Sequence, residues 1–277
     1  MIPPKAKSAD FLGRFREVIS DPLNLLIERV PMAGVVEGTD VYLHNGNRVP
    51  IEGDDAYYGS FSKLLVINRG VHEPLEEYVF QQLIKILPEA PLMIELGSYW
   101  AHYSMWLKKM RPQATVILID TDAAYLTTGA NNFRRNGFGG EFFQAFVGTG
   151  HLEIDSFRES RMLPKIDVLH VDIQGFELEM LKGCQNSLSE ERVDYLVVST
   201  HSQEKHFGVV TTLAGLGYRI EVTSELDNET TSFDGFVFAS SRNAQKVFQK
   251  EFVPLGRTTI VECSPARLLQ HLLEIAS

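Results

Sequence analysis

The sequence predicts an α/β fold whose core is a mostly parallel sheet with helices on both faces. After residue 91, seven short apolar runs alternate with helical patterns, as expected for parallel strands joined by crossover helices. The runs are LMIEL, TVILID, EFFQAFV, IDVLHVD, DYLVVST, YRIEV and GFVFAS. Helices are expected between them at about residues 100–111, 123–136, 175–188 and 203–216. The last two runs have no helical pattern between them, which predicts a hairpin and an antiparallel last strand.

Residues 1–88 contain a mixture of short elements, and we expect them to form a cap, a lid or a contact in a homo-oligomer. Apolar spacing predicts helices in ADFLGRFREVIS, DPLNLLIERV and EPLEEYVFQQLIKIL, the last ending before Pro88. Strand-like pieces lie around DVYLH and KLLVI. Residues 89–241 are expected to form the core. Residues 242–277 are expected to form an extension with helices in NAQKVFQKEF and SPARLLQHLLEIAS.

Composition narrows the classes of function. The chain has 277 residues, and no apolar run reaches the roughly 18 residues of a membrane span. Its first residues, MIPPKAKSADF, lack the apolar segment of a secretory signal, and two cysteines make no disulfide framework. The net charge of −10 disfavours a broad phosphate-binding surface. We therefore expect a cytoplasmic protein that binds neither nucleic acid nor membrane.

The first strand and the helix after it contain candidate ligand-binding residues. Ligands of open α/β sheets bind beyond the carboxyl ends of the strands, where Gly97 lets the backbone approach them. The segment ELGSYWA lacks the G-x-G-x-x-G pattern of dinucleotide sites. Glu95 disfavours a pyrophosphate and suits an ammonium group, such as that of S-adenosylmethionine. The second strand ends VILIDTD, which places Asp120 to accept hydrogen bonds from a ribose, unless it is an ordinary acid at a strand end.

Three longer motifs lie at the ends of the predicted strands: IELGSYWAHYS, IDTDAAYLTTGANNFRRNG and KIDVLHVDIQGFELEMLKG. They resemble the motifs of the FkbM-type methyltransferases, a branch of the class I S-adenosylmethionine-dependent enzymes. In the third motif Asp172, Gly175 and Glu177 match the family pattern, and Gln174 replaces its usual acid. The resemblance covers about residues 70–240. It implies the Rossmann-like, seven-stranded class I sheet and S-adenosylmethionine as cofactor.

The resemblance also implies which residues contact the cofactor. The set is Glu73, Glu95, Gly97, Ser98, Asp120, Thr121, Phe146, Val147 and Asp172. Within it, Glu73 belongs to the segment VHEPLEEY, which resembles the family's acid–proline pair and implies a contact with the cofactor ammonium. Asp120 is implied to hold the ribose, and Phe146 to lie beside the adenine.

Methyl transfer to a hydroxyl requires aligned atoms and a group that removes the proton. Asp172 ends the fourth strand and His201 follows the fifth, so we expect both to be catalytic. With Glu177, they form an edge expected to hold Mg²⁺ against a vicinal diol, although Glu177 suits the first turn of a helix equally well. His170 is expected to be a hydrogen-bonded core residue, and His102 to face either the cofactor or solvent.

The expected activity is O-methylation of a small molecule, sugar or glycan, with the hydroxylated acceptor as the main partner. The segment DDAYYGSFS has side chains suited to such an acceptor, or is a plain loop. Gln174 motivates an alternative, a cofactor-binding regulatory protein without methyl transfer. A nicotinamide-dependent oxidoreductase is disfavoured by the missing glycine motif.

Overall fold

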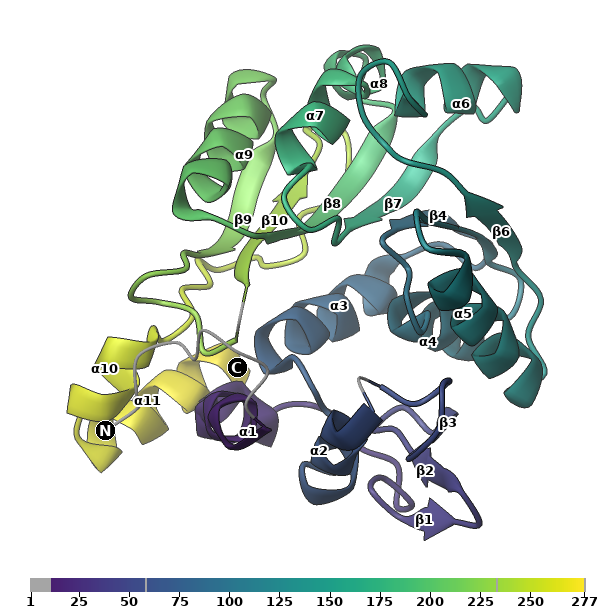
Figure 1. The fold of residues 1–277 in the computed structure, drawn as a ribbon. Coiled ribbons are helices and arrows are strands. Elements are labelled where there is room, and N and C mark those ends of the chain that lie inside the picture. Colours follow the sequence, from purple (N-terminus) through teal and green to yellow (C-terminus); the bar gives the residue numbers. More distant parts are fainter. Residues whose placement is uncertain (1–10, 58, 233, 277) are drawn as a thin grey trace.

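The computed structural model describes residues 11–57, 59–232 and 234–276, and its centre is a seven-stranded sheet (Figure 1). The strand order is β6-β5-β4-β7-β8-β10-β9. In that order the strands span Glu141–Gln144, Thr115–Asp120, Leu92–Leu96, Ile166–Val171, Val193–Thr200, Gly235–Ser240 and Arg219–Ser224. Pairing is parallel from β6 to β8, whereas β10 runs antiparallel to both β8 and β9. The predicted Rossmann-like sheet with an antiparallel last strand is confirmed, and that strand lies between β8 and β9.

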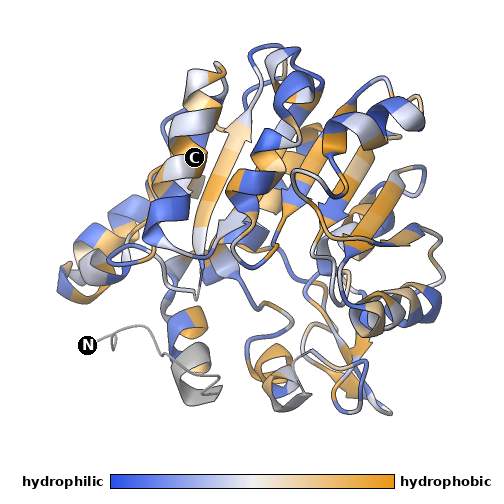
Figure 2. Ribbon diagram, turned by 45° about the horizontal axis from the view of Figure 1, so that its top comes forward, coloured by the Kyte–Doolittle hydropathy of each residue, from blue (hydrophilic) through white to orange (hydrophobic). Residues whose placement is uncertain are grey.

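Helices cover both faces of this sheet. One face packs against helices at the top of Figure 1, which are α6 Ile154–Ser160, α7 Glu177–Lys182, α8 Gln185–Ser189 and α9 Gln203–Gly215. The other face packs against α3 Pro74–Ile86, α4 His102–Met110 and α5 Ala123–Arg135. Val116 and Leu118 of β5 belong to one core, and Ile117 and Ile119 to the other, as the two-residue period of a strand requires. The strands are accordingly apolar in Figure 2.

The N-terminal residues pack on the same core as α3 and α4. They form α1 Phe11–Ser20, a short helix Pro22–Leu25, a sheet of β1 Val36–Glu37, β2 Asp40–Tyr42 and β3 Arg48–Pro50, a short helix Gly59–Ser62 and α2 Lys63–Ile67. Leu43 and Val49 share one hydrophobic cluster with Trp106 and Phe133. Residues 1–10 of the expected cap lie outside the described residues. The boundaries at 88 and 241 stay a prediction.

The helix from Asp21 is shorter than expected, and the helix predicted at about residues 175–188 is divided into α7 and α8. Two further elements differ from the sequence prediction. The run KLLVI forms helix α2 rather than a strand, because a short apolar run without alternation fits either structure. The segment NAQKVFQKEF forms no helix. Its Val247 and Phe248 amides both donate to Glu221 Oε2 at 2.9 Å instead of bonding to the preceding turn.

Two further helices end the described chain, α10 Arg257–Glu262 and α11 Pro265–Ala276. The sequence predicted α11 and missed α10. Within the described residues, no helix combines the length and apolar character that crossing a membrane requires.

Candidate functional site

A cavity of about 430 Å³ opens at the carboxyl ends of β4, β5 and β7. All nine residues expected to contact the cofactor line it, although their individual roles stay predictions. Four of them are carboxylates, namely Glu73, Glu95, Asp120 and Asp172. Among the described residues, no lysine or arginine lines the cavity. Its chemistry therefore favours a cationic ligand over a phosphate.

Gly97 is required by the packing of the strand ends as well as by access for a ligand. Its φ is +73°, and a Cβ at this position would lie 1.8 Å from the carbonyl oxygen of Asp172. Three nearby residues with side chains also adopt positive φ: Tyr99 at 36°, Ala101 at 66° and Gln174 at 50°. Strained backbone of this kind is concentrated at functional sites. Here it shapes the two loops that border the cavity.

Glu95 lies at the bottom of the cavity and also binds the first turn of α4. Its side chain is buried, and its Oε2 accepts a hydrogen bond from the Ser104 amide at 3.1 Å. Burial raises the pKa of Glu95 to about 8. The carboxyl therefore carries a proton at neutral pH until a cation enters, and a bound ammonium would favour its ionised form.

Asp120 ends β5 with its carboxylate held in a fixed orientation. Oδ2 accepts from the Tyr99 amide and Oδ1 from the Asp122 amide, both at 3.0 Å. Burial raises the pKa of Asp120 above its usual value. Beyond it, Phe146 packs edge-on against Phe176, with 4.6 Å between ring centroids. The two rings form an apolar wall on the side of the cavity where the adenine was expected.

Asp172, Glu177, His201 and Asp234 form an ion-paired group that we call the His201 cluster. Nδ1 of His201 lies 2.5 Å from Glu177 Oε1, and its Nε2 lies 3.1 Å from Asp172 Oδ1 and 3.6 Å from Asp234 Oδ1. Burial lowers the pKa of His201, but the hydrogen bonds to Asp172 and Glu177 outweigh it and raise the pKa to about 10. His201 is therefore an imidazolium at neutral pH, and in that form it has no lone pair with which to take a proton. Its expected catalytic role stays a prediction.

The His201 cluster also bears on the expected Mg²⁺ site. Asp172 and Glu177 contact opposite nitrogens of one ring, so these two side chains and His201 do not face a common point. A protonated imidazole already occupies the space between these carboxylates, and Mg²⁺ requires oxygen ligands in near-octahedral geometry. The residues present do not fit Mg²⁺ in this arrangement.

Asp172 and His201 also differ in their access to the cavity. Asp172 lines it, whereas His201 is not among the lining residues. Gln174, which replaces the family acid, donates from Nε2 to Asp172 Oδ1 at 3.2 Å. Gln174 and His201 therefore both orient Asp172, which is the member of the His201 cluster that lines the cavity.

The sequence left open whether His102 faces the cofactor or solvent, and the structure places it, buried, in the lining of the cavity. Further aromatic and histidine residues of the lining come mainly from the N-terminal segment and the start of α4, and they include Tyr57, His72, Trp100, Tyr103 and His170. Tyr57 belongs to the segment DDAYYGSFS, of which Tyr58 lies outside the described residues.

His170 is buried as expected, but within the described residues neither ring nitrogen has a hydrogen-bond partner, which corrects the prediction of a hydrogen-bonded residue. Its ring instead packs on Tyr103, with centroids 4.2 Å apart. A two-residue strand period, which places His170 on the face of Asp172, is the signal that could have located it.

A comparison with known protein families shows which family the chain belongs to. The family model described as the methyltransferase FkbM domain matches residues 64–220, more than half of the chain. The chain belongs to the FkbM methyltransferase family. It is therefore an S-adenosylmethionine-dependent methyltransferase, as the sequence motifs indicated. No curated protein matches the chain.

Solved structures similar to the enzyme include further methyltransferases. A precorrin-6y C5,15-methyltransferase from Geobacter metallireducens is 14% identical, with 60% of this chain and 87% of that chain covered and a TM-score of 0.44. The METTL16 methyltransferase domain is 12% identical, with 61% and 66% covered and a TM-score of 0.46. TrmK of M. capricolum, in complex with S-adenosylhomocysteine, is 12% identical, with 71% and 81% covered and a TM-score of 0.42. These TM-scores are low, so the assignment rests on the family match.

Proposed function

We propose that this FkbM methyltransferase methylates a hydroxyl group of a small molecule, sugar or glycan. The proposal rests on one observation. Carboxylates line the cavity, and Gln174 and His201 bind Asp172, the member of the His201 cluster that lines it. A cavity without lysine or arginine among its described lining residues suits an uncharged, hydroxylated acceptor better than a phosphorylated one.

The cavity also fits the cofactor that the family uses. Four carboxylates complement its positive charges, and the Ser98 hydroxyl is buried with no hydrogen-bond partner among the described residues. An unpaired buried hydroxyl is costly unless a ligand satisfies it. We infer that Glu73, Glu95 and Ser98 hold the methionine end. Asp120 and Thr121 then hold the ribose, and Phe146 and Val147 flank the adenine.

Asp172 is the residue we propose as the proton acceptor. Bound S-adenosylmethionine supplies an electrophilic methyl group on a sulfonium that leaves as a neutral thioether. Asp172 would accept the hydrogen of the acceptor hydroxyl and take its proton as the oxygen attacks. His201 keeps its own proton at neutral pH, and we therefore propose that it is a positioning residue that orients Asp172.

We also propose a role for the N-terminal segment in binding the acceptor. Tyr57 brings the segment Asp54 to Ser62 to the cavity, so we propose that this N-terminal segment contacts the acceptor. The proposal includes no step through Mg²⁺, because Asp172, Glu177 and His201 do not fit that ion as arranged.

Transfer of a labelled methyl group tests the proposed function. The purified chain is incubated with S-adenosylmethionine labelled in its methyl group and a panel of sugars, polyols and phenols, with and without Mg²⁺. We expect label in a hydroxylated acceptor, with one S-adenosylhomocysteine formed per methyl group and no need for Mg²⁺. Label found on nitrogen would contradict O-methylation. Bound cofactor that no acceptor consumes, with Asp172→Asn indistinguishable from the unmodified enzyme, would favour the regulatory alternative.

A further inference from the structure

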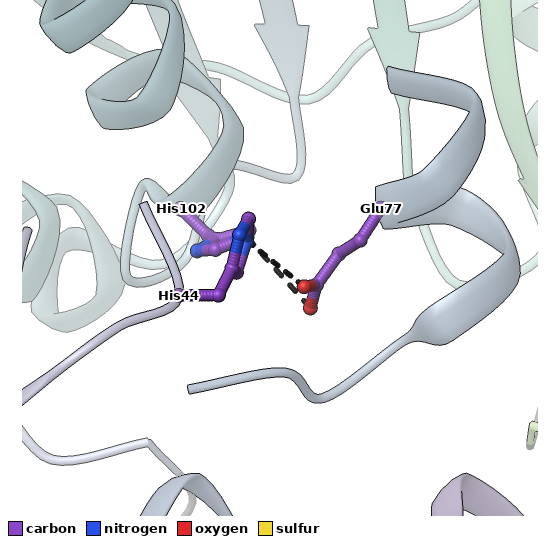
Figure 3. Close-up of side chains that lie close together, drawn as sticks. All are labelled: His44, Glu77 and His102. Atoms are coloured by element: carbon purple, nitrogen blue, oxygen red, sulfur yellow. Dashed lines mark ion pairs between the residues drawn. The ribbon is translucent and has the colours of Figure 1, made fainter. Parts of the chain in front are cut away.

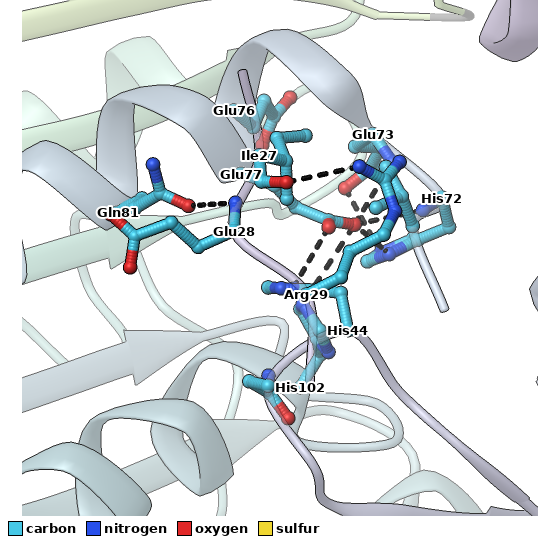
Figure 4. A network of polar contacts seen from close by, with 12 residues as sticks. Ile27, Glu28, Arg29, His44, His72, Glu73, Glu76, Glu77, Gln81 and His102 are labelled. Carbon is cyan, nitrogen blue, oxygen red and sulfur yellow. Dashed lines mark hydrogen bonds and ion pairs between the residues drawn. The ribbon is translucent and has the colours of Figure 1, made fainter. Parts of the chain in front are cut away.

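A group of three histidines lies beside the cavity, on the face of the sheet covered by α3 and α4. It consists of one carboxylate, Glu77 of α3, and three imidazoles, and we call it the Glu77 cluster (Figures 3 and 4). His44 comes from the N-terminal segment after β2, His72 precedes α3, and His102 begins α4. All four residues are at most 2% exposed. Three separate parts of the chain thus bring these groups together in the interior.

The atoms of three members lie within reach of one small ion. Nε2 of His44 is 2.9 Å from Glu77 Oε2, and ligand atoms of His44, Glu77 and His102 all lie within 4.8 Å of one another. Zn²⁺ with bonds of about 2.1 Å in tetrahedral geometry separates its ligand atoms by about 3.4 Å. Side-chain shifts on the order of 1 Å would therefore place all three on one ion. Figure 3 shows the two imidazoles directed at the carboxylate.

His102 provides a second observation that points to a ligand. Its ring is buried against Trp100, with centroids 5.0 Å apart and planes 17° apart. Within the described residues, neither of its ring nitrogens has a hydrogen-bond partner. Burying an unsatisfied polar group costs free energy, so such atoms in native proteins are normally bound to something. Metal coordination through Nε2 would satisfy this imidazole.

The remaining partners hold Glu77 in the orientation that a metal ligand needs. Its Oε1 accepts hydrogen bonds from the backbone amides of His72 at 2.8 Å and Glu73 at 3.1 Å. The same oxygen lies 2.5 Å from Nδ1 of His72. Oε2 is left facing His44. In metal sites, a carboxylate that binds the ion is regularly held in place by hydrogen bonds from residues that do not bind the ion themselves. His72 would hold Glu77 in this way.

We propose that His44, Glu77 and His102 bind a divalent transition-metal ion, with Zn²⁺ as the preferred ion. Two imidazoles and one carboxylate are a known zinc ligand set that leaves a fourth position open. Imidazole ligands also disfavour Mg²⁺ and Ca²⁺, which take oxygen ligands. His102 lines the cavity, so one ligand of the proposed ion borders the substrate space. This site is distinct from the His201 cluster, where the sequence suggested a metal.

An ion-pair network without metal is the competing explanation. Three imidazoles have six ring nitrogens, of which Glu77 reaches only some, and of the six Glu73 Oε2 contacts only Nε2 of His72, at 3.2 Å. His72 is well paired in such a network, but His102 is not, with its Nε2 3.8 Å from Glu77 Oε1. A bound metal ion would give His102 the partner that hydrogen bonding does not supply within the described residues.

Metal analysis of the full chain tests the proposal. The untagged protein is equilibrated with Zn²⁺, dialysed against metal-free buffer and measured by plasma mass spectrometry. We expect about one zinc per chain, lost in His44→Gln and in His102→Gln. His206→Gln is the matched control, because His206 is buried but bonds to Thr200 and Thr223 outside the cluster. It should retain the zinc.

A second measurement keeps the test valid if a variant does not fold. Excess Zn²⁺ should raise the melting temperature of the unmodified chain by about 5 °C, since a ligand that binds only the folded state stabilises it. Mg²⁺ at the same concentration should not. Zinc retained in both variants, or an unmodified chain with neither bound zinc nor a thermal response to Zn²⁺, overturns the proposal.

Discussion

The His201 cluster and the Glu77 cluster contain the same two kinds of side chain in opposite proportions. In the first, a single imidazole contacts the carboxylates of Asp172, Glu177 and Asp234. In the second, the carboxylate of Glu77 is surrounded by three imidazoles, of which His72 also contacts Glu73. Both groups are largely removed from water. Comparing them shows that the majority partner decides the charge of the minority group.

The pKa values follow this difference. Burial lowers the pKa of His201, yet its carboxylate partners outweigh burial and raise that pKa to about 10. In the other cluster, burial lowers the pKa of His102 well below its usual value. Burial raises the pKa of Glu77, but the neighbouring imidazoles outweigh it and hold that pKa well below normal. Both clusters therefore retain a proton beside the cavity, on His201 and on His72, whose pKa Glu73 and Glu77 raise to about 9 against the effect of burial. Only the Glu77 cluster also offers a neutral imidazole, His102, beside an ionised carboxylate.

The largest effect should come from removing the carboxylate that we propose as proton acceptor. Asp172→Asn is expected to lower the methyl-transfer rate by about 10²–10⁴-fold, the usual contribution of a general base. Asp167→Asn is a suitable control, since Asp167 lies near the start of β7, the strand that leads to Asp172, but binds the Leu92 amide away from the cavity. Equal rates for Asp172→Asn and the unmodified enzyme, measured with an identified acceptor, would remove Asp172 from the mechanism.

The next largest effect should separate the two clusters by stability. Glu77→Gln leaves buried imidazoles without their shared anion, and we expect a loss of about 3–5 kcal/mol in the free energy of unfolding. His201→Gln should cost less, about 2 kcal/mol, because its side chain is 12% exposed and water screens Asp172 and Asp234, although Glu177 stays buried. Urea titrations measure both values. The reverse order would contradict the view that the Glu77 cluster is the more tightly buried.

The pH dependence of stability should report on the His201 cluster together with His72, because Glu73 and Glu77 outweigh burial and raise the pKa of His72 to about 9. The pKa of His201 is raised from 6.5 to about 10 on folding, so the folded state holds a proton that the unfolded state loses in this range. The stabilisation is complete below about pH 6.5 and is lost as the pH rises through about 10. The melting temperature should therefore fall between pH 7 and pH 10. His201→Gln should reduce this slope, and an unchanged slope would assign the loss to other groups.

A smaller effect is expected in cofactor binding. Burial raises the pKa of Glu95 to about 8, and a bound ammonium should favour its ionised form, so binding releases a proton. Affinity for S-adenosylhomocysteine should rise by up to about tenfold per pH unit towards pH 8 and then level off. Calorimetry in two buffers of different ionisation enthalpy measures the proton released. In Glu95→Gln the release should disappear, and its persistence would place the proton elsewhere.

Much of the sheet and its strand ends could be predicted from the sequence because their signals are local. Apolar runs and crossover spacing located the strands, and the motifs around Gly97 and Asp172 placed cofactor candidates on one cavity. The Glu77 cluster could not be predicted in this way. His44 and His102 are 58 positions apart, and only the packing of the N-terminal segment on α4 brings them together. The charge of His201 could not be predicted from the sequence either, because it depends on Asp172, Glu177 and Asp234, which the fold brings to its ring.

Binding of S-adenosylmethionine to the acidic cavity is the central claim, and calorimetry on three proteins tests it most directly. The unmodified chain, Asp120→Ala and Asp122→Ala are titrated with S-adenosylmethionine. Asp122 is the matched control, because it is the next acid along the chain but caps α5 and does not line the cavity. We predict micromolar binding that weakens at least about tenfold in Asp120→Ala, where the ribose loses charge-assisted hydrogen bonds, and persists in Asp122→Ala. Equal binding in all three proteins, or none in the unmodified chain, would contradict the account.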